Sequence, residues 1–342
     1  MCKGYSFSSN DLLCNLCNQQ TKQSEEASFP NVFLILDLNH FNLIKAFNRY
    51  ANVFVYFIDA WKFTHIIHRV IGRIKAECKS FPDLPLRLAS KLVNCPHNII
   101  PRQIDPNAVD LVFVSDPITC RINLKPFKNA IKAYWSHDHI YPQTYYTQLL
   151  STQIQEYDII FCAHKSYLDI FQELGLKVHY LPFAYDPDIH RPMNIAEKYD
   201  LAFIGTITPQ RAKVIKEIRK RLKNIRFFVG RAWQHDMVKV YNESKIVLNI
   251  SRLSEINWRI FEVLGCKRFL LTNRSQEVEE LFHDKEHLVM YDDIESLILN
   301  VKEYLQNPEE RNIIASQGYE EAAKKHTIFH RAKEVLITAG VM

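Results

Sequence analysis

The sequence of 342 residues lacks several features that would each assign it to a familiar class. Its longest apolar runs, such as VFLIL at 32–36, are far shorter than the roughly 20 residues needed to cross a bilayer. No GxGxxG or P-loop motif is present, so no motif indicates a dinucleotide cofactor or ATP hydrolysis. The net charge of +5 is too mild to indicate nucleic-acid binding. We therefore expect a protein that does not span a membrane and does not bind nucleic acid.

The eight cysteines do not form the dense framework of a small secreted fold, and no signal peptide is recognised. We expect them to be reduced and the protein to be cytoplasmic. Cys14 and Cys17 form a CxxC pair that is open to a zinc or redox interpretation. A zinc site needs about four ligands and no second CxxC follows, so a pair of thiols in a loosely ordered tail is favoured.

Short apolar runs alternate with helix-length segments in both halves of the chain. Examples are NVFLILDL at 31–38, NVFVYFID at 52–59, DLVFVSD at 110–116, DLAFIGT at 200–206 and KIVLNIS at 245–251. Continuous apolar strands alternating with helices are typical of a parallel sheet covered on both faces. The pattern predicts an α/β fold of two tandem Rossmann-like parallel-sheet domains, with an interdomain cleft and a C-terminal helix.

The length also indicates about two domains, at roughly 150 residues each. A polar stretch containing AYDPDIHRPMNIAEK separates the two alternating halves. We predict a polar tail at 1–28, an N-terminal Rossmann-like domain at 29–190, a C-terminal Rossmann-like domain at 191–325 and a C-terminal helix at 326–342. Ligands of such sheets bind at the carboxyl ends of the strands.

The stretch INWRIFEVLGCKRFLLTN at 256–273 places charged residues close to the predicted core. On a helix predicted over 255–265, Glu255, Arg259 and Glu262 share one face. One interpretation is an exposed, salt-bridged helix surface. The other follows from position, because a helix N-terminus beside a strand's carboxyl end attracts phosphate. Arg pairs well with a diphosphate and Glu accepts ribose hydroxyls, so a nucleotide pocket is plausible.

FIGTITPQR at 203–211 supplies a second candidate element. Gly205 ends a predicted strand, where a glycine permits close approach to a ligand, although an ordinary tight turn is equally consistent. We expect Arg211 to reach the same anion. Basic residues dominate 211–231, but an apolar stripe there indicates an amphipathic helix with a solvated basic face, and contact with an anionic membrane is the minority interpretation.

His137 and Asp138 follow a predicted strand in the first half. Either side chain at a strand end facing the cleft suits a general base or the orientation of an acceptor hydroxyl, and capping of the next helix is equally open. His137 and His139 form an HxH pair, but no further metal ligands are evident. Asp186-Pro-Asp188 spells the DxD of some metal sites, yet its proline-rich context argues against that role, so we predict no metal.

The second half resembles a known family. DLAFIGTITPQR, YNESKIVLNIS, NWRIFEVLGCKRFLLTN and the helical segment that follows are similar, in order and spacing, to the CgeB-like spore maturation glycosyltransferases. These belong among the group 1 glycosyltransferases of GT-B architecture. The resemblance covers residues 200–336 and is looser in the first half, mainly through YDIIFCAHKSYLDIFQELGLKVHYLPFAYDPDIHRP.

The resemblance implies transfer of a sugar from a nucleotide diphosphate sugar held by the C-terminal domain, without a metal or any other cofactor. Carried over by motif, the donor-binding residues are Gly205 and Arg211 at the phosphates, Asn249 and Ser251 at the pocket edge, Arg259 at the diphosphate and Glu262 at the ribose. Many relatives separate two glutamates by seven residues, whereas six lie between Glu255 and Glu262 here. We therefore assign Glu255 no role in donor binding.

The leading hypothesis is thus a cytoplasmic glycosyltransferase whose partners are a nucleotide-sugar donor and an unidentified acceptor. That acceptor is a saccharide, lipid, protein or metabolite, and His137 and Asp138 are the catalytic candidates beside it. Two alternatives stay open, a non-catalytic subunit that keeps the fold and a sugar-nucleotide epimerase. Neither the nucleotide base nor the stereochemical outcome follows from the residues.

Overall fold

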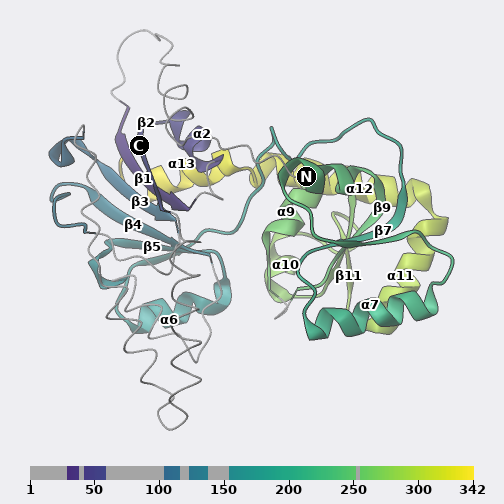
Figure 1. Ribbon diagram of the computed structural model, residues 1–342. Helices are drawn as coiled ribbons and strands as arrows, with labels where there is room; N and C mark the ends of the chain where they lie inside the picture. Colours follow the sequence, from purple (N-terminus) through teal and green to yellow (C-terminus); the bar gives the residue numbers. More distant parts are fainter. Residues whose placement is uncertain (1–28, 38–41, 59–103, 116–122, 138–153, 252–254) are drawn as a thin grey trace, which may run out of the picture.

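Figure 1 shows a computed structural model in which two α/β halves lie side by side. The described residues are 29–37, 42–58, 104–115, 123–137, 154–251 and 255–342. The predicted tail at 1–28, with Cys14 and Cys17, lies outside them, and so does Asp138. The predicted fold class of two parallel-sheet α/β domains is confirmed.

The first half is built on a six-stranded sheet with the order β2-β1-β3-β4-β5-β6. Its strands are β1 (Asn31–Asp37), β2 (Asn52–Ile58), β3 (Leu111–Ser115), β4 (Ile131–Ser136), β5 (Ile159–Cys162) and β6 (Val178–Tyr180). Its helical elements are α2 (Asn42–Asn48), η2 (Pro106–Ala108), η3 (Ile154–Glu156), η4 (Lys165–Tyr167) and α6 (Leu168–Glu173). All pairings are parallel, and β3 and β5 are buried along their whole lengths, as continuous apolar runs predict.

The second half is built on a five-stranded parallel sheet with the order β11-β10-β9-β7-β8. Its strands are β7 (Tyr199–Ile204), β8 (Phe227–Gly230), β9 (Ser244–Asn249), β10 (Phe269–Asn273) and β11 (Val289–Tyr291). Its helices are α7 (Pro209–Arg221), α8 (Gln234–Asn242), α9 (Trp258–Gly265), α10 (Gln276–Leu281), α11 (Ile294–Gln306) and α12 (Pro308–Lys325). The predicted boundary between residues 190 and 191 falls in the segment between β6 and β7.

Helix α7 begins where local chemistry favours it. The Thr208 hydroxyl accepts a hydrogen bond from the Arg211 amide, and Pro209 occupies the first turn. Ile215 and Ile218 bury one side against the sheet, while Lys213 and Lys216 are exposed. None of the helices among the described residues is long and apolar enough to span a membrane.

Helix α9 corrects one expectation. The spacing predicts a helix from residue 255, but α9 begins at Trp258, with Asn257 as its N-cap in an extended conformation. Glu255 therefore lies in the preceding loop and does not share a helical face with Arg259 and Glu262. Its backbone amide instead donates to the Ser251 hydroxyl at 2.8 Å, which holds the loop after β9.

The C-terminal helix α13 (Ile328–Thr338) leaves the second half and packs against α2 of the first, as Figure 1 shows in yellow beside purple. The chain thus crosses between the halves twice. The crossings are joined, because the Tyr185 amide donates to the His326 carbonyl and the Ile328 amide donates to the Tyr185 carbonyl. Buried Arg331 adds hydrogen bonds to the carbonyls of Pro182 and Phe183.

The Asp186-Pro-Asp188 segment forms a turn that is tied to α2. Lys45 on α2 pairs with Asp186 at 2.7 Å and with Asp188 at 2.5 Å, and Asp186 is buried. Within the described residues, no group of three or more potential metal-ligating side chains is gathered in one place. The two aspartates therefore hold a lysine and fix the linker against the first half.

Gly318 tests the packing of α12 against α9 and the backbone at His287. A Cβ at this position would overlap the His287 carbonyl oxygen and approach the Leu264 side chain at 2.8 Å. We expect Gly318→Ala to lower the free energy of unfolding by about 1–3 kcal/mol, because backbone cannot yield as a flexible side chain does. Urea denaturation measures this. Gln317→Ala, at the exposed neighbouring position, should change it by less than about 0.5 kcal/mol.

Candidate functional site

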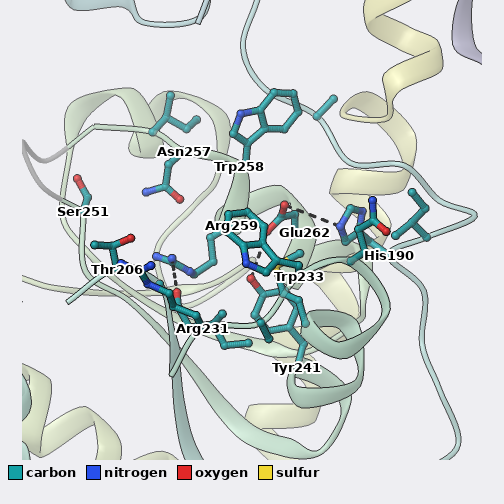
Figure 2. A pocket seen from close by; sticks show the side chains of 18 of the residues that line it. His190, Thr206, Arg231, Trp233, Tyr241, Ser251, Asn257, Trp258, Arg259 and Glu262 are labelled. Carbon is teal, nitrogen blue, oxygen red and sulfur yellow. Dashed lines mark hydrogen bonds and ion pairs between the residues drawn. The ribbon is translucent and has the colours of Figure 1, made fainter. Parts of the chain in front are cut away.

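A cavity of about 590 Å³ lies where the loops after β7, β8 and β9 face the linker between the two sheets. Figure 2 shows its lining side chains. The charged and aromatic lining residues are His190, Arg211, Arg231, Trp233, Tyr241, Glu255, Trp258, Arg259 and Glu262. Asn42, Ala184 and Ile189 complete the wall from the first half and the linker. The cavity thus occupies the predicted place, at the carboxyl ends of parallel strands and between two domains.

Arg259 projects from the first turn of α9 across the strand ends. Its Nη1 donates to Asn249 Oδ1 at 2.6 Å, and its Nη2 donates to the Ile204 carbonyl. Its guanidinium also lies over the Phe203 ring, 5.3 Å from the centroid. Within the described residues its partners are neutral, so its positive charge is held in place without a carboxylate counterion.

Arg211 lies beside it on the same aromatic ring. Its guanidinium is 5.5 Å from the Phe203 centroid, and its Nε and Nη1 donate to the carbonyls of Ile250 and Thr206 at 2.8 and 3.0 Å. Gly205 lets the Arg259 guanidinium lie close to the backbone, because a Cβ there would be 2.7 Å from Arg259 Nη2. The glycine at this strand end is therefore required by close packing of a guanidinium.

Asn249 lies beneath the cavity wall and not at its edge. Its side chain is fully buried, its Nδ2 donates to Thr272 Oγ1 at 3.0 Å, and its Oδ1 accepts from Arg259. The Tyr291 hydroxyl holds the Asn249 carbonyl at 2.9 Å. Asn249 is thus a support for Arg259, whereas Ser251 lines the cavity as the resemblance implies.

Glu262 lies one turn after Arg259 on α9. The Tyr241 hydroxyl donates to its Oε2 at 3.2 Å, and His190 Nε2 lies 3.8 Å from its Oε1 (Figure 2). Burial, together with the nearby Glu262 carboxylate, holds the pKa of Tyr241 well above its ordinary value. The phenol therefore stays protonated and donates, which keeps the carboxylate in one orientation.

The loop after β8 contributes Arg231 and Trp233. The Trp233 side chain is 75% exposed although it lines the cavity, so a large flat apolar surface faces solvent at the entrance. Arg231 is also exposed and adds a third positive charge. An exposed indole beside cationic groups is suited to stacking on a flat ring that carries an anionic substituent.

His137 is placed beside the cavity but is not among its lining residues. It is buried at the end of β4, its Nε2 lies 3.2 Å from Ser115 Oγ, and its ring lies 6.2 Å from that of Trp258. Trp258 is the lining residue between them. The catalytic roles of His137 and Asp138 stay predictions.

Several cavity residues were missed from the sequence. Tyr241 and His190 bear on Glu262 only through tertiary contacts, since they come from α8 and from the linker. Arg231 and Trp233 lie in a polar stretch without a recognisable motif. The only sequence signal was an isolated tryptophan among polar residues, which is unusual for a side chain of that size.

Known proteins share much of the part of the chain that lines this cavity. Residues 208–337 match the family described as "Glycosyl transferase-like", a span that includes Arg211, Arg259 and Glu262. No curated protein matches the chain. The chain is similar over its length to solved structures, although at identities that establish only a shared fold.

Three solved structures illustrate the likeness. HepE of Anabaena, in complex with UDP and glucose, has a TM-score of 0.58 and 11% identity over 92% of this chain and 100% of its own. A glycosyltransferase of Rickettsia africae has a TM-score of 0.55 and 10% identity over 92% and 98%. Sucrose-phosphate synthase of Thermosynechococcus elongatus has a TM-score of 0.58 and 10% identity over 90% and 98%.

These matches confirm the GT-B fold. The family match places a glycosyl transferase-like region at residues 208–337, in agreement with the predicted enzyme class. The family match and the solved structures do not test the narrower resemblance to CgeB-like proteins.

The close approach of Arg259 to Gly205 predicts that a larger residue at position 205 weakens anion binding. Gly205→Ala should weaken the binding of inorganic pyrophosphate by about tenfold, because the new Cβ displaces the guanidinium from its carbonyl and amide acceptors. Isothermal titration calorimetry measures this. Gly230→Ala is the matched control, since it ends the neighbouring strand and its Cβ would contact only Phe228. Equal affinities in the two variants would contradict the assignment of Arg259.

Proposed function

We propose that the protein transfers a sugar from a UDP-sugar to an acceptor and binds the donor in this cavity. The observation that carries the proposal is the pair of Arg259 and Glu262, which are one turn apart on α9 and fixed by separate partners. A guanidinium without a carboxylate counterion suits a diphosphate, and an oriented carboxylate suits the two hydroxyls of a ribose.

The other lining residues support the same placement. Arg211 and Arg231 flank Arg259 and add positive charge where the two phosphates would lie. Trp233 offers its exposed face to the uracil ring, because base–aromatic stacking is worth about 1–3 kcal/mol. UDP is our choice of nucleotide because the similar HepE structures contain UDP or UDP-glucose.

We further propose that no metal is needed. In the transition state the leaving UDP gains negative charge, and positioned cations stabilise that charge without reorganisation. Arg259 and Arg211 supply such cations, each oriented by carbonyl oxygens before the donor arrives. His137 and Asp138 are proposed to act on the acceptor from the first domain. Membership of the CgeB-like group and contact between the lysines of α7 and anionic lipid also stay predictions.

The first test is calorimetric titration of the protein with UDP, GDP, ADP and CDP. We expect selective binding of UDP, and a loss of about 1.5–3 kcal/mol of binding free energy in Glu262→Ala, the range for hydrogen bonds to charged groups. Glu309→Ala, an exposed glutamate on α12, is the control and should bind UDP as the unmodified protein does. No binding of any of the four nucleotides would favour the non-catalytic alternative.

The second test follows the donor itself. Transferases often release free sugar slowly, so incubation with UDP-glucose, UDP-galactose or UDP-N-acetylglucosamine should yield UDP at a rate that excess EDTA leaves unchanged. Chromatography of the products measures this rate and also distinguishes an epimerase, which would convert the donor without releasing UDP. Loss of UDP release in EDTA, restored by Mg²⁺ or Mn²⁺, would contradict metal independence.

A further inference from the structure

The order of groups along the cavity indicates where the transferred sugar lies. Figure 2 shows Glu262 and His190 on one side of Arg259, and Ser251 and Asn257 on the other. A nucleotide sugar carries its diphosphate between its ribose and its sugar. If Glu262 takes the ribose and Arg259 the diphosphate, the sugar extends toward Ser251 and Asn257.

Glu255 is the carboxylate at that end. Its amide donates to Ser251 Oγ at 2.8 Å, it stands two residues before Asn257, and it lines the cavity although most of its surface is buried. Carboxylates accept hydrogen bonds from hydroxyl groups, and sugars present several hydroxyls. Glu255 is therefore placed to accept from the sugar, although its spacing from Glu262 gave it no role in the sequence.

The other half of the protein supplies the contact that orients this carboxylate. Tyr167, in the η4 turn after β5, donates its hydroxyl to Glu255 Oε1 at 3.1 Å. Burial, and then the charge of Glu255, raise the pKa of Tyr167, so the phenol remains a donor at neutral pH. The bond joins residues 88 positions apart in the chain.

The same turn is fastened to the second half by two glutamates of α10. The Ser166 amide donates to Glu277 Oε1 at 3.1 Å, His164 Nδ1 lies 3.8 Å from Glu277 Oε2, and Lys165 pairs with Glu280. Burial acts to raise the pKa of Glu277, but the nearby His164 and the Ser166 amide outweigh it and hold the pKa low. The segment 164–167 thus keeps one position against the second half.

We propose that Tyr167 is a positioning residue for donor-sugar recognition, which orients Glu255 toward the sugar only while segment 164–167 is fastened to α10. This rests on the proposed UDP-sugar function and names the part of the same cavity that reads the sugar. Recognition of the nucleotide then depends on the second half and on His190 of the linker, whereas recognition of the sugar also requires segment 164–167 of the first half.

The binding free energies of the UDP part and of the sugar part of the donor depend on different residues. UDP contacts Arg259 and Glu262, whose partners Asn249, Ile204 and Tyr241 belong to the second half. Removing the Tyr167 hydroxyl leaves those partners in place. It removes the phenol donor from Glu255 Oε1, so the carboxylate is oriented less firmly and its hydrogen bonds to the sugar weaken.

The test compares dissociation constants for UDP and for UDP-glucose, UDP-galactose and UDP-N-acetylglucosamine by calorimetry. In the unmodified protein we expect one sugar nucleotide to bind more tightly than UDP. Tyr167→Phe should reduce that preference by about tenfold while leaving the UDP constant within about twofold. Tyr180→Phe is the matched control, because it removes a buried hydroxyl on the adjoining strand that has no hydrogen-bond partner in the described residues. It should behave as the unmodified protein.

The outcomes separate the inference from the function on which it rests. No binding of UDP to the unmodified protein would overturn the proposed function. UDP binding with no preference for any of the three sugars would leave the nucleotide site standing and overturn the role of Glu255. An unchanged preference in Tyr167→Phe, or equal losses for UDP and the sugar nucleotide, would overturn the positioning role of Tyr167.

Discussion

The cavity depends on one buried polar arrangement, the anchoring of Arg259 to the ends of two adjacent strands. Its guanidinium bonds the Ile204 carbonyl at the end of β7 and the Asn249 side chain at the end of β9. A charge held by neutral dipoles keeps its field available to a ligand, whereas a charge paired with a carboxylate does not. Gly205, Phe203, Thr272 and Tyr291 serve this arrangement by giving the arginine space, a π face and a fixed acceptor.

The second organising feature is the division of the ligand site between covalently distant segments. Glu262 meets Tyr241 from α8 and His190 from the linker, and Glu255 meets Tyr167 from the first half. The linker is held in position because Lys45 pairs with the buried Asp186. Glu255 and Glu262 are thus oriented by Tyr167, His190 and Tyr241, which belong to no motif. Substitutions at such distant positions in the chain can therefore alter the site.

This division also explains what the sequence could predict. The two sheets, α7 and the grouping of Gly205, Arg211, Arg259 and Glu262 follow from local apolar runs and from a motif on one continuous segment. The start of α9 was predicted three residues early, because Glu255, Arg259 and Glu262 have helical spacing although the Glu255 amide bonds the Ser251 hydroxyl before the helix begins. Asn249 was predicted at the pocket edge, whereas the structure places it fully buried beneath the cavity wall. Arg231 and His190 carry no local signal, and Trp233 only that of a tryptophan among polar residues, since only the packing of loops brings them to the cavity.

The two crossings between the halves have a mechanical consequence. The linker and the start of α13 run side by side, joined by the backbone bonds of Tyr185 and by Arg331. A single tether would let the halves swivel in any direction. Two tethers that are bonded to each other, at residues 182–185 and 326–331, limit the directions in which one half can move relative to the other. Ala184, within the first of these tethers, lines the cavity, so the joined crossings also form part of the cavity wall.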